Sequence, residues 1–138
     1  MDNRNLQVDK KHQNQYHNKL SCLLVGPFSS RSGYGDHARD MFHSFLKLNK
    51  KYFRSVKVLD VPWGDCPRNA LDANHGDDNI IIKSMLTPNE LTNQNLKFDV
   101  GVDIRIPNEF EKFGQMVNIG ITAGIETSQV SPEFLEGV

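Results

Sequence analysis

A short apolar run near residue 20 constrains the fold of this chain more than any other feature. Residues 20–25 read LSCLLV and end at Gly26-Pro27, a near-continuous apolar character that is typical of a parallel strand buried on both faces. A polar loop with two glycines follows, and beyond it apolar residues recur with the helical period: Ala38, Met41, Phe42, Phe45 and Leu46. A strand, a glycine loop and a helix in this order predict the opening of a βαβ unit.

The rest of the chain alternates short strands with helical or loop connections. After the first helix we expect a strand over 56–61, a long loop over 62–78 and a short helix over 80–86 with Asp77 or Asp78 as its N-cap. Two further strands follow over 99–107 and 116–122, and a last helix begins at Ser131-Pro132-Glu133. This order predicts an α/β domain, a doubly wound, mostly parallel Rossmann-like sheet. Because the last helix has barely begun when the chain ends, we expect a fragment of a longer or split protein.

Length and composition restrict the class of protein further. The 138 residues suit one domain, and 16 basic against 17 acidic residues give a net charge of −1, which argues against a nucleic-acid binder. Residues 1–18 are polar and lack any period, so we expect a disordered tail and a folded domain over 19–138. The sequence has neither a secretory signal nor an apolar run long enough for a membrane span. With only two cysteines, a reducing cytoplasm is the expected compartment.

Three polar segments follow predicted strands and could line one cleft, because ligands of open α/β sheets bind beyond the carboxyl ends of the strands. They are Ser29–Gly35, Pro107–Glu109 and Thr122–Thr127. Neither the dinucleotide fingerprint nor the P-loop pattern is met in the first segment. It is either a plain βα turn or a site where glycine backbone meets an anionic or sugar ligand. In the second case, a side chain at Gly33 or Gly35 would block the ligand.

Charged residues near these segments are weaker candidates. Arg31 could grip a phosphate or carboxylate, while Glu109, Glu126 and His37 are candidate acid–base groups whose proximity the sequence cannot establish. We interpret Asp103 and Arg105 as a satisfied ion pair on an edge strand. A basic stretch that contains no acid either complements the end of a helix or forms a patch for lipid or an anionic polymer: Lys47, Lys50, Lys51, Arg54 and Lys57.

Three segments together resemble a known family. They are similar to the N-terminal region of GT-B glycosyltransferases of the group 1 type, in bacterial and phage-borne members. The segments are residues 32–39 (SGYGDHAR) after Gly26-Pro27, residues 99–110, and residues 118–127 (NIGITAGIET) followed by Ser131-Pro132-Glu133. The resemblance covers about residues 19–138. It implies two Rossmann-like domains that face each other across a cleft, of which this chain is the N-terminal, acceptor-side domain and the C-terminal, donor-side domain is missing.

The resemblance also implies an activity and its site. The activity is transfer of a sugar from a nucleotide-sugar co-substrate to a hydroxyl of a glycan, lipid or small molecule, with no metal or other cofactor, and peripheral contact with a membrane is compatible with it. Substrate-binding candidates are Arg31, Ser32, Gly33, Tyr34, Gly35, Thr122, Gly124 and Glu126. Because the donor-side domain is missing, we expect no transfer by this chain alone. The alternative function is a carbohydrate- or nucleotide-binding module without turnover.

Overall fold

The computed structural model describes residues 19–113, 117–123 and 131–136. The tail expected over 1–18 lies outside the described residues, as do Met116, Gly124 and Glu126. The start of the helix expected at Ser131 is described, and α5 spans Pro132–Glu136.

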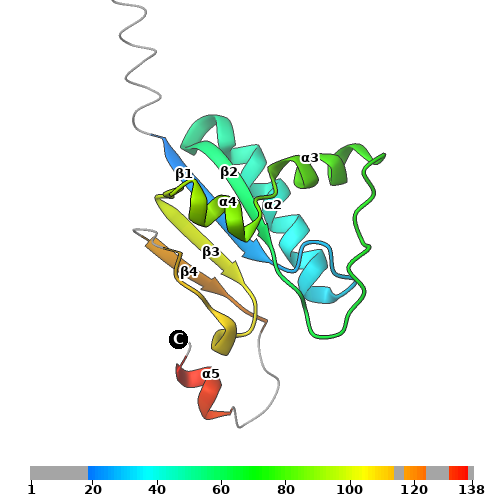
Figure 1. Cartoon of the computed structure of the whole chain (residues 1–138), viewed down its shortest axis with the longest axis vertical. Helices are drawn as coiled ribbons and strands as arrows, with labels where there is room; N and C mark the ends of the chain where they lie inside the picture. Colours follow the sequence, from blue (N-terminus) through cyan, green and yellow to red (C-terminus); the bar gives the residue numbers. More distant parts are fainter. Residues whose placement is uncertain (1–18, 114–116, 124–130, 137–138) are drawn as a thin grey trace, which may run out of the picture.

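Four parallel strands form one sheet with the order β2-β1-β3-β4 (Figure 1). These are β1 (Leu20–Gly26), β2 (Phe53–Asp60), β3 (Val100–Ile104) and β4 (Val117–Ile121). The register places Leu24 opposite Val58 on one side and opposite Val102 on the other. The α/β class with a parallel, Rossmann-like sheet, which the sequence predicts, is therefore confirmed.

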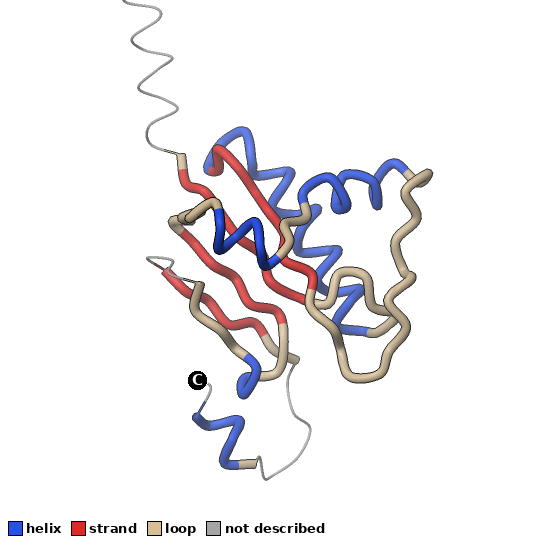
Figure 2. Tube along the Cα trace, in the orientation of Figure 1, coloured by secondary structure: helices blue, strands red, loops and turns tan. Residues whose placement is uncertain are grey.

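Helices cover the two faces of this sheet (Figure 2). The long helix α2 (Gly33–Tyr52) packs on one face, where α3 (Gly76–Ser84) adds the buried Ile81. On the other face lies α4 (Pro88–Asn93), whose Leu91 packs on the sheet. The short 3₁₀ helix η1 (Pro107–Glu109) follows β3 and contacts α5. Among the described residues, no helix has both the length and the hydropathy to span a membrane.

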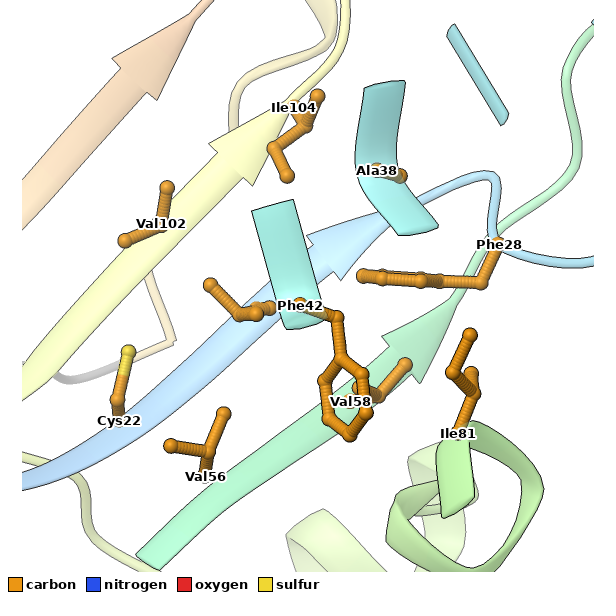
Figure 3. Close-up of a cluster of buried hydrophobic side chains, with 10 residues drawn as sticks. Cys22, Phe28, Ala38, Phe42, Val56, Val58, Ile81, Val102 and Ile104 are labelled. Carbon is orange, nitrogen blue, oxygen red and sulfur yellow. The ribbon is translucent and has the colours of Figure 1, made fainter. Parts of the chain in front are cut away.

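The two faces of β1 belong to two separate apolar clusters, because its side chains alternate. Toward α2 lies the larger cluster, drawn in Figure 3: Cys22, Leu24, Phe28, Ala38, Phe42, Val56, Val58, Ile81, Val102 and Ile104. Leu23, Val25, Leu59 and Phe98 form the second cluster on the opposite face. A strand buried on both faces accounts for the continuous apolar run of residues 20–25.

Two helices differ from the expected elements. Helix α3 begins at Gly76 with His75 as its N-cap, so that Asp77 and Asp78 occupy its first turn instead of capping it. Their negative charges still stabilise the helix there, because they lie at the positive end of its dipole. Helix α4 was not expected, and it is set by a capping box in which Glu90 N–H donates to Thr87 Oγ1 at 3.2 Å while Thr87 N–H donates to Glu90 Oε2 at 2.7 Å.

The environment of Asp103 and Arg105 also differs from the expectation. The ion pair is present, with Arg105 Nε 2.7 Å from Asp103 Oδ1. However, β3 is an interior strand between β1 and β4, and both side chains are only 7% exposed. The alternation of residues 99–107 therefore indicates a polar face that is buried, because the segment after β3 folds back over it.

Candidate functional site

The sheet has one topological switch point, at the carboxyl ends of β1 and β3. The chain passes from β1 to its neighbour β2 and then returns to the other side of β1 to form β3. The loops that leave β1 and β3 consequently diverge, and ligands of open α/β sheets bind in the crevice between such loops. Two of the three segments singled out from the sequence, Ser29–Gly35 and Pro107–Glu109, lie at this point.

The loop after β1 is held in place by a largely buried arginine side chain. Arg39, one turn into α2, donates from Nη1 to the carbonyl oxygens of Phe28 at 2.7 Å and Ser30 at 3.0 Å, and its Nη2 pairs with Asp36. Ser32 caps the helix, since its Oγ accepts from the N–H of Gly35 at 3.1 Å. The loop is thus preorganised before any ligand arrives.

The segment after β2 supports the same loop from the side. Asp60, at the end of β2, accepts hydrogen bonds from Ser29 N–H at 3.0 Å and from Arg68 Nη2 at 2.7 Å. Arg31 donates from its backbone N–H to the carbonyl of Pro67 at 3.0 Å and from Nε to Asn69 Oδ1 at 2.7 Å. The guanidinium of Arg31 is therefore already committed to the neighbouring segment, which was not visible from the sequence.

The two glycines of the loop have different roles. A Cβ added at Gly35 would lie 2.2 Å from the carbonyl oxygen of Ser30 and 3.0 Å from that of Pro27, so the loop itself occupies the space that a side chain would need. A Cβ added at Gly33 would meet nothing within 4 Å. Gly35 is thus required for packing between the loop and α2, whereas Gly33 borders open space where a ligand can approach.

The start of α2 offers free hydrogen-bond donors at that open position. Among the described residues, the backbone N–H groups of Gly33 and Tyr34 donate to no acceptor, whereas those of Gly35 and Asp36 are satisfied by Ser32. Free amides at the start of a long helix attract anions.

Tyr34 connects the start of α2 to the segments that follow two other strands. Its hydroxyl lies 3.0 Å from Thr122 Oγ1 and accepts a hydrogen bond from the N–H of Ala123 at 3.1 Å, just beyond β4. Its ring packs on Trp63, beyond β2, with ring centroids 4.2 Å apart. The first and third candidate segments therefore meet at Tyr34, while a cleft lined by all three segments stays a prediction.

The two described acid–base candidates, His37 and Glu109, are not joined to this cluster by any hydrogen bond or ion pair among the described residues. His37, in the first turn of α2, and Glu109, in η1, are exposed, and within the described part of the chain neither side chain makes a hydrogen bond or ion pair. Gly124 and Glu126 lie outside the described residues. Moreover, no three His, Cys, Asp or Glu side chains in residues 19–113, 117–123 and 131–136 are grouped so as to hold a metal ion.

A cavity of about 420 Å³ lies on the face away from α2, over β3 and β4. Its lining includes Asp103, Phe110, Glu111 and Gly120. Both oxygens of Asp103 are occupied: Arg105 bonds to each, and Glu111 N–H donates to Oδ2 at 2.9 Å. A Cβ at Gly120 would lie 2.3 Å from the ring of Phe110, so this glycine admits an aromatic side chain. Sequence reasoning missed this contact, because no periodic pattern links Phe110 to Gly120.

Comparison of the chain with models of protein families, with curated proteins and with solved structures gave no match in any of the three. The assignment of the site accordingly depends on its geometry.

Proposed function

We propose that this chain is the acceptor-side domain of a nucleotide-sugar-dependent glycosyltransferase, and that its site is the crevice bordered by Gly33, Tyr34 and Thr122. The observation that carries the proposal is the contact of Tyr34 with Thr122 and Ala123. This contact brings together two of the segments on which the resemblance to GT-B enzymes rests, at the edge of the sheet where ligands bind.

The chemistry needs a place for the leaving diphosphate. In sugar transfer the bond between the anomeric carbon and the diphosphate breaks, and a bond to the acceptor hydroxyl oxygen forms. The free amides of Gly33 and Tyr34 at the start of α2 suit the negative charge on the leaving group. The exposed Thr122 and the partly exposed rings of Tyr34 and Trp63 suit a polar sugar ring with an apolar face. Catalysis of this kind depends on positioning and electrostatics.

The proposal also includes the compartment in which the protein acts, for which the two cysteines give an argument. Cys22 and Cys66 are both free thiols, and burial raises the pKa of the Cys22 thiol to about 12, so this thiol is inert. Free thiols suit the reducing cytoplasm, where we place the protein. In this proposal a donor-side domain supplies further contacts to the nucleotide.

Titration of the ¹⁵N-labelled chain with UDP-, GDP- and ADP-sugars, followed by NMR, tests the site. We expect the amide signals of Gly33, Tyr34 and Ala123 to shift with at least one donor, and no release of nucleotide when an acceptor glycan is added. Gly33→Val should weaken binding by about tenfold or more, because the side chain fills the open space.

Gly76→Val is the matched control, since Gly76 is also the first residue of a helix and also borders open space. Shifts confined to other parts of the sheet, or equal losses in the two valine variants, would contradict the proposed site. Binding of a free saccharide without any nucleotide donor would favour the non-catalytic carbohydrate-binding module. Nucleotide release by the chain alone would show that a donor-side domain is not required.

A further inference from the structure

Three large apolar side chains are exposed together at the end of the molecule opposite the proposed cleft. Leu48 and Tyr52 are 45% and 47% exposed and lie four residues apart in α2, hence on one side of its last turns. Leu20 is 44% exposed and pairs with Phe53, the residue after Tyr52. Figure 1 shows the start of β1 and the end of α2 at the same end of the molecule.

Three lysines lie in the same last two turns of α2 as Leu48 and Tyr52. Lys47, Lys50 and Lys51 are exposed, and within the described part of the chain none of them forms an ion pair. The ammonium of Lys51 lies 4.7 Å from the ring centroid of Tyr52. We call the six residues the Lys–Leu end: Leu20, Lys47, Leu48, Lys50, Lys51 and Tyr52.

The other two residues of the basic stretch, Arg54 and Lys57, interact with acidic groups outside the Lys–Leu end. Arg54 Nη2 lies 3.3 Å from Asp99 Oδ2, and the charge of Lys57 acts on Glu90 beside α4. Two lysines in the last turn of α2 complement the helix dipole. That role accounts neither for Lys47, one turn earlier, nor for the exposed leucines, which gain nothing from the helix dipole.

We propose that the Lys–Leu end docks on the surface of an anionic lipid bilayer. Long lysine side chains reach the headgroups while leucine and tyrosine side chains enter the boundary region, the division that interfacial proteins use. The chain as a whole carries a net charge of −1, so its net charge does not attract it to an anionic surface, and a local cluster of cations is needed. An anionic surface matches both halves of the cluster, the exposed apolar groups and the lysines, which have no acidic partner among the described residues.

Docking in this way fixes the orientation of the molecule. Strand β1 runs from the Lys–Leu end at Leu20 to the switch point at Gly26, so the crevice opens away from the bilayer. An acceptor that reaches the crevice would then be dissolved, or extended from the membrane on a long head group. This consequence rests on the proposed function, whereas the docking itself does not.

Cosedimentation of the full chain with vesicles tests the docking. We expect binding to phosphatidylcholine vesicles that contain 30% phosphatidylglycerol, little binding to pure phosphatidylcholine, and weaker binding at high salt. The triple variant Lys47→Gln, Lys50→Gln, Lys51→Gln should bind at least about tenfold more weakly, because each lysine near an anionic surface contributes roughly fivefold.

The control triple Lys83→Gln, Lys97→Gln, Lys112→Gln makes the same change in charge at exposed positions elsewhere and should bind as the unmodified chain does. Leu48→Ser should weaken binding by about threefold or more, with circular dichroism confirming that both triples and Leu48→Ser remain folded. Equal losses in the two triples, or equal binding to both vesicle types, would overturn the proposal. Loss in the lysine triple but none in Leu48→Ser would also overturn it, because the apolar side chains would then take no part in the docking.

Discussion

At the scale of single residues, Gly33 and Gly35 have different structural roles although they are only two positions apart. Gly35 packs against carbonyl oxygens of its own loop, and Gly33 borders open space. The sequence pattern G-x-G treats them alike, and from it we expected both to admit a ligand. Only the path of the loop, fixed by the hydrogen bonds of Arg39, separates the two roles, and no local pattern encodes that path.

The first prediction concerns these glycines. Gly35→Ala should lower the free energy of unfolding by about 1–3 kcal/mol or more, because the new methyl group cannot fit beside the backbone of Ser30. Gly33→Ala should change it by less than about 1 kcal/mol. Urea unfolding of both variants provides the measurement. If Gly35→Ala were as stable as Gly33→Ala, the loop would be able to move away and would not be preorganised.

A second prediction concerns the ion pair between Asp103 and Arg105. Either Asp103→Ala or Arg105→Ala should cost about 3–5 kcal/mol. The first leaves the buried Arg105 with only the exposed Glu111, 3.5 Å away, among the described residues, and the second leaves the buried Asp103 without its counter-ion. The double variant should cost clearly less than the sum of the two, which chemical denaturation can show. Costs below about 1 kcal/mol, typical of exposed pairs, would instead support the edge-strand environment expected from the sequence.

At the scale of elements, three strands are joined at their amino ends by one carboxylate. Asp99, which precedes β3, accepts hydrogen bonds from the N–H of Ser21 at 2.7 Å and from its hydroxyl at 2.9 Å in β1. Arg54 of β2 approaches the same oxygen at 3.3 Å. These hydrogen bonds from Ser21, with a smaller contribution from the charge of Arg54, hold the pKa of Asp99 below its ordinary value.

The third prediction follows from that lowered pKa. A carboxyl group whose pKa is lower in the folded than in the unfolded state stabilises the fold above the unfolded pKa, near 4, and this contribution is lost as the pH falls through the folded value. Asp99→Asn should therefore lower stability at neutral pH and flatten the decline of stability below about pH 4. Urea unfolding across a pH series measures both effects.

Asp65→Asn, at an exposed position in the segment after β2, is the control and should leave the pH profile unchanged. An unaltered acid profile in Asp99→Asn would mean that the junction of the three strands does not depend on the charge of Asp99.

At the scale of the whole molecule, the sequence predicts the layers better than the site. Apolar periods were sufficient for β1, α2 and the parallel sheet, because burial on one or both faces leaves a pattern along the chain. Helix α4 was missed because its signal is a six-residue segment with a capping box and no apolar period. The contact of Tyr34 with Thr122 joins residues 88 positions apart, and such a contact leaves no local trace.

The last prediction concerns how stability is distributed over the sheet. Strand β1 lies between β2 and β3 and is buried from Ser21 to Gly26, so its amides should exchange with solvent only when the whole domain unfolds. Strand β4 pairs only with β3 within the described residues, and Val117 and Ile119 are 50% and 44% exposed, so it should open locally at lower cost. Hydrogen exchange followed by NMR should show the amides of β1 at least about a hundredfold more protected than those of β4. Equal protection in the two strands would mean either that the sheet opens as one unit or that another copy of the chain covers β4 in solution. Repeating the measurement at tenfold lower protein concentration distinguishes these two cases, because only the second depends on concentration.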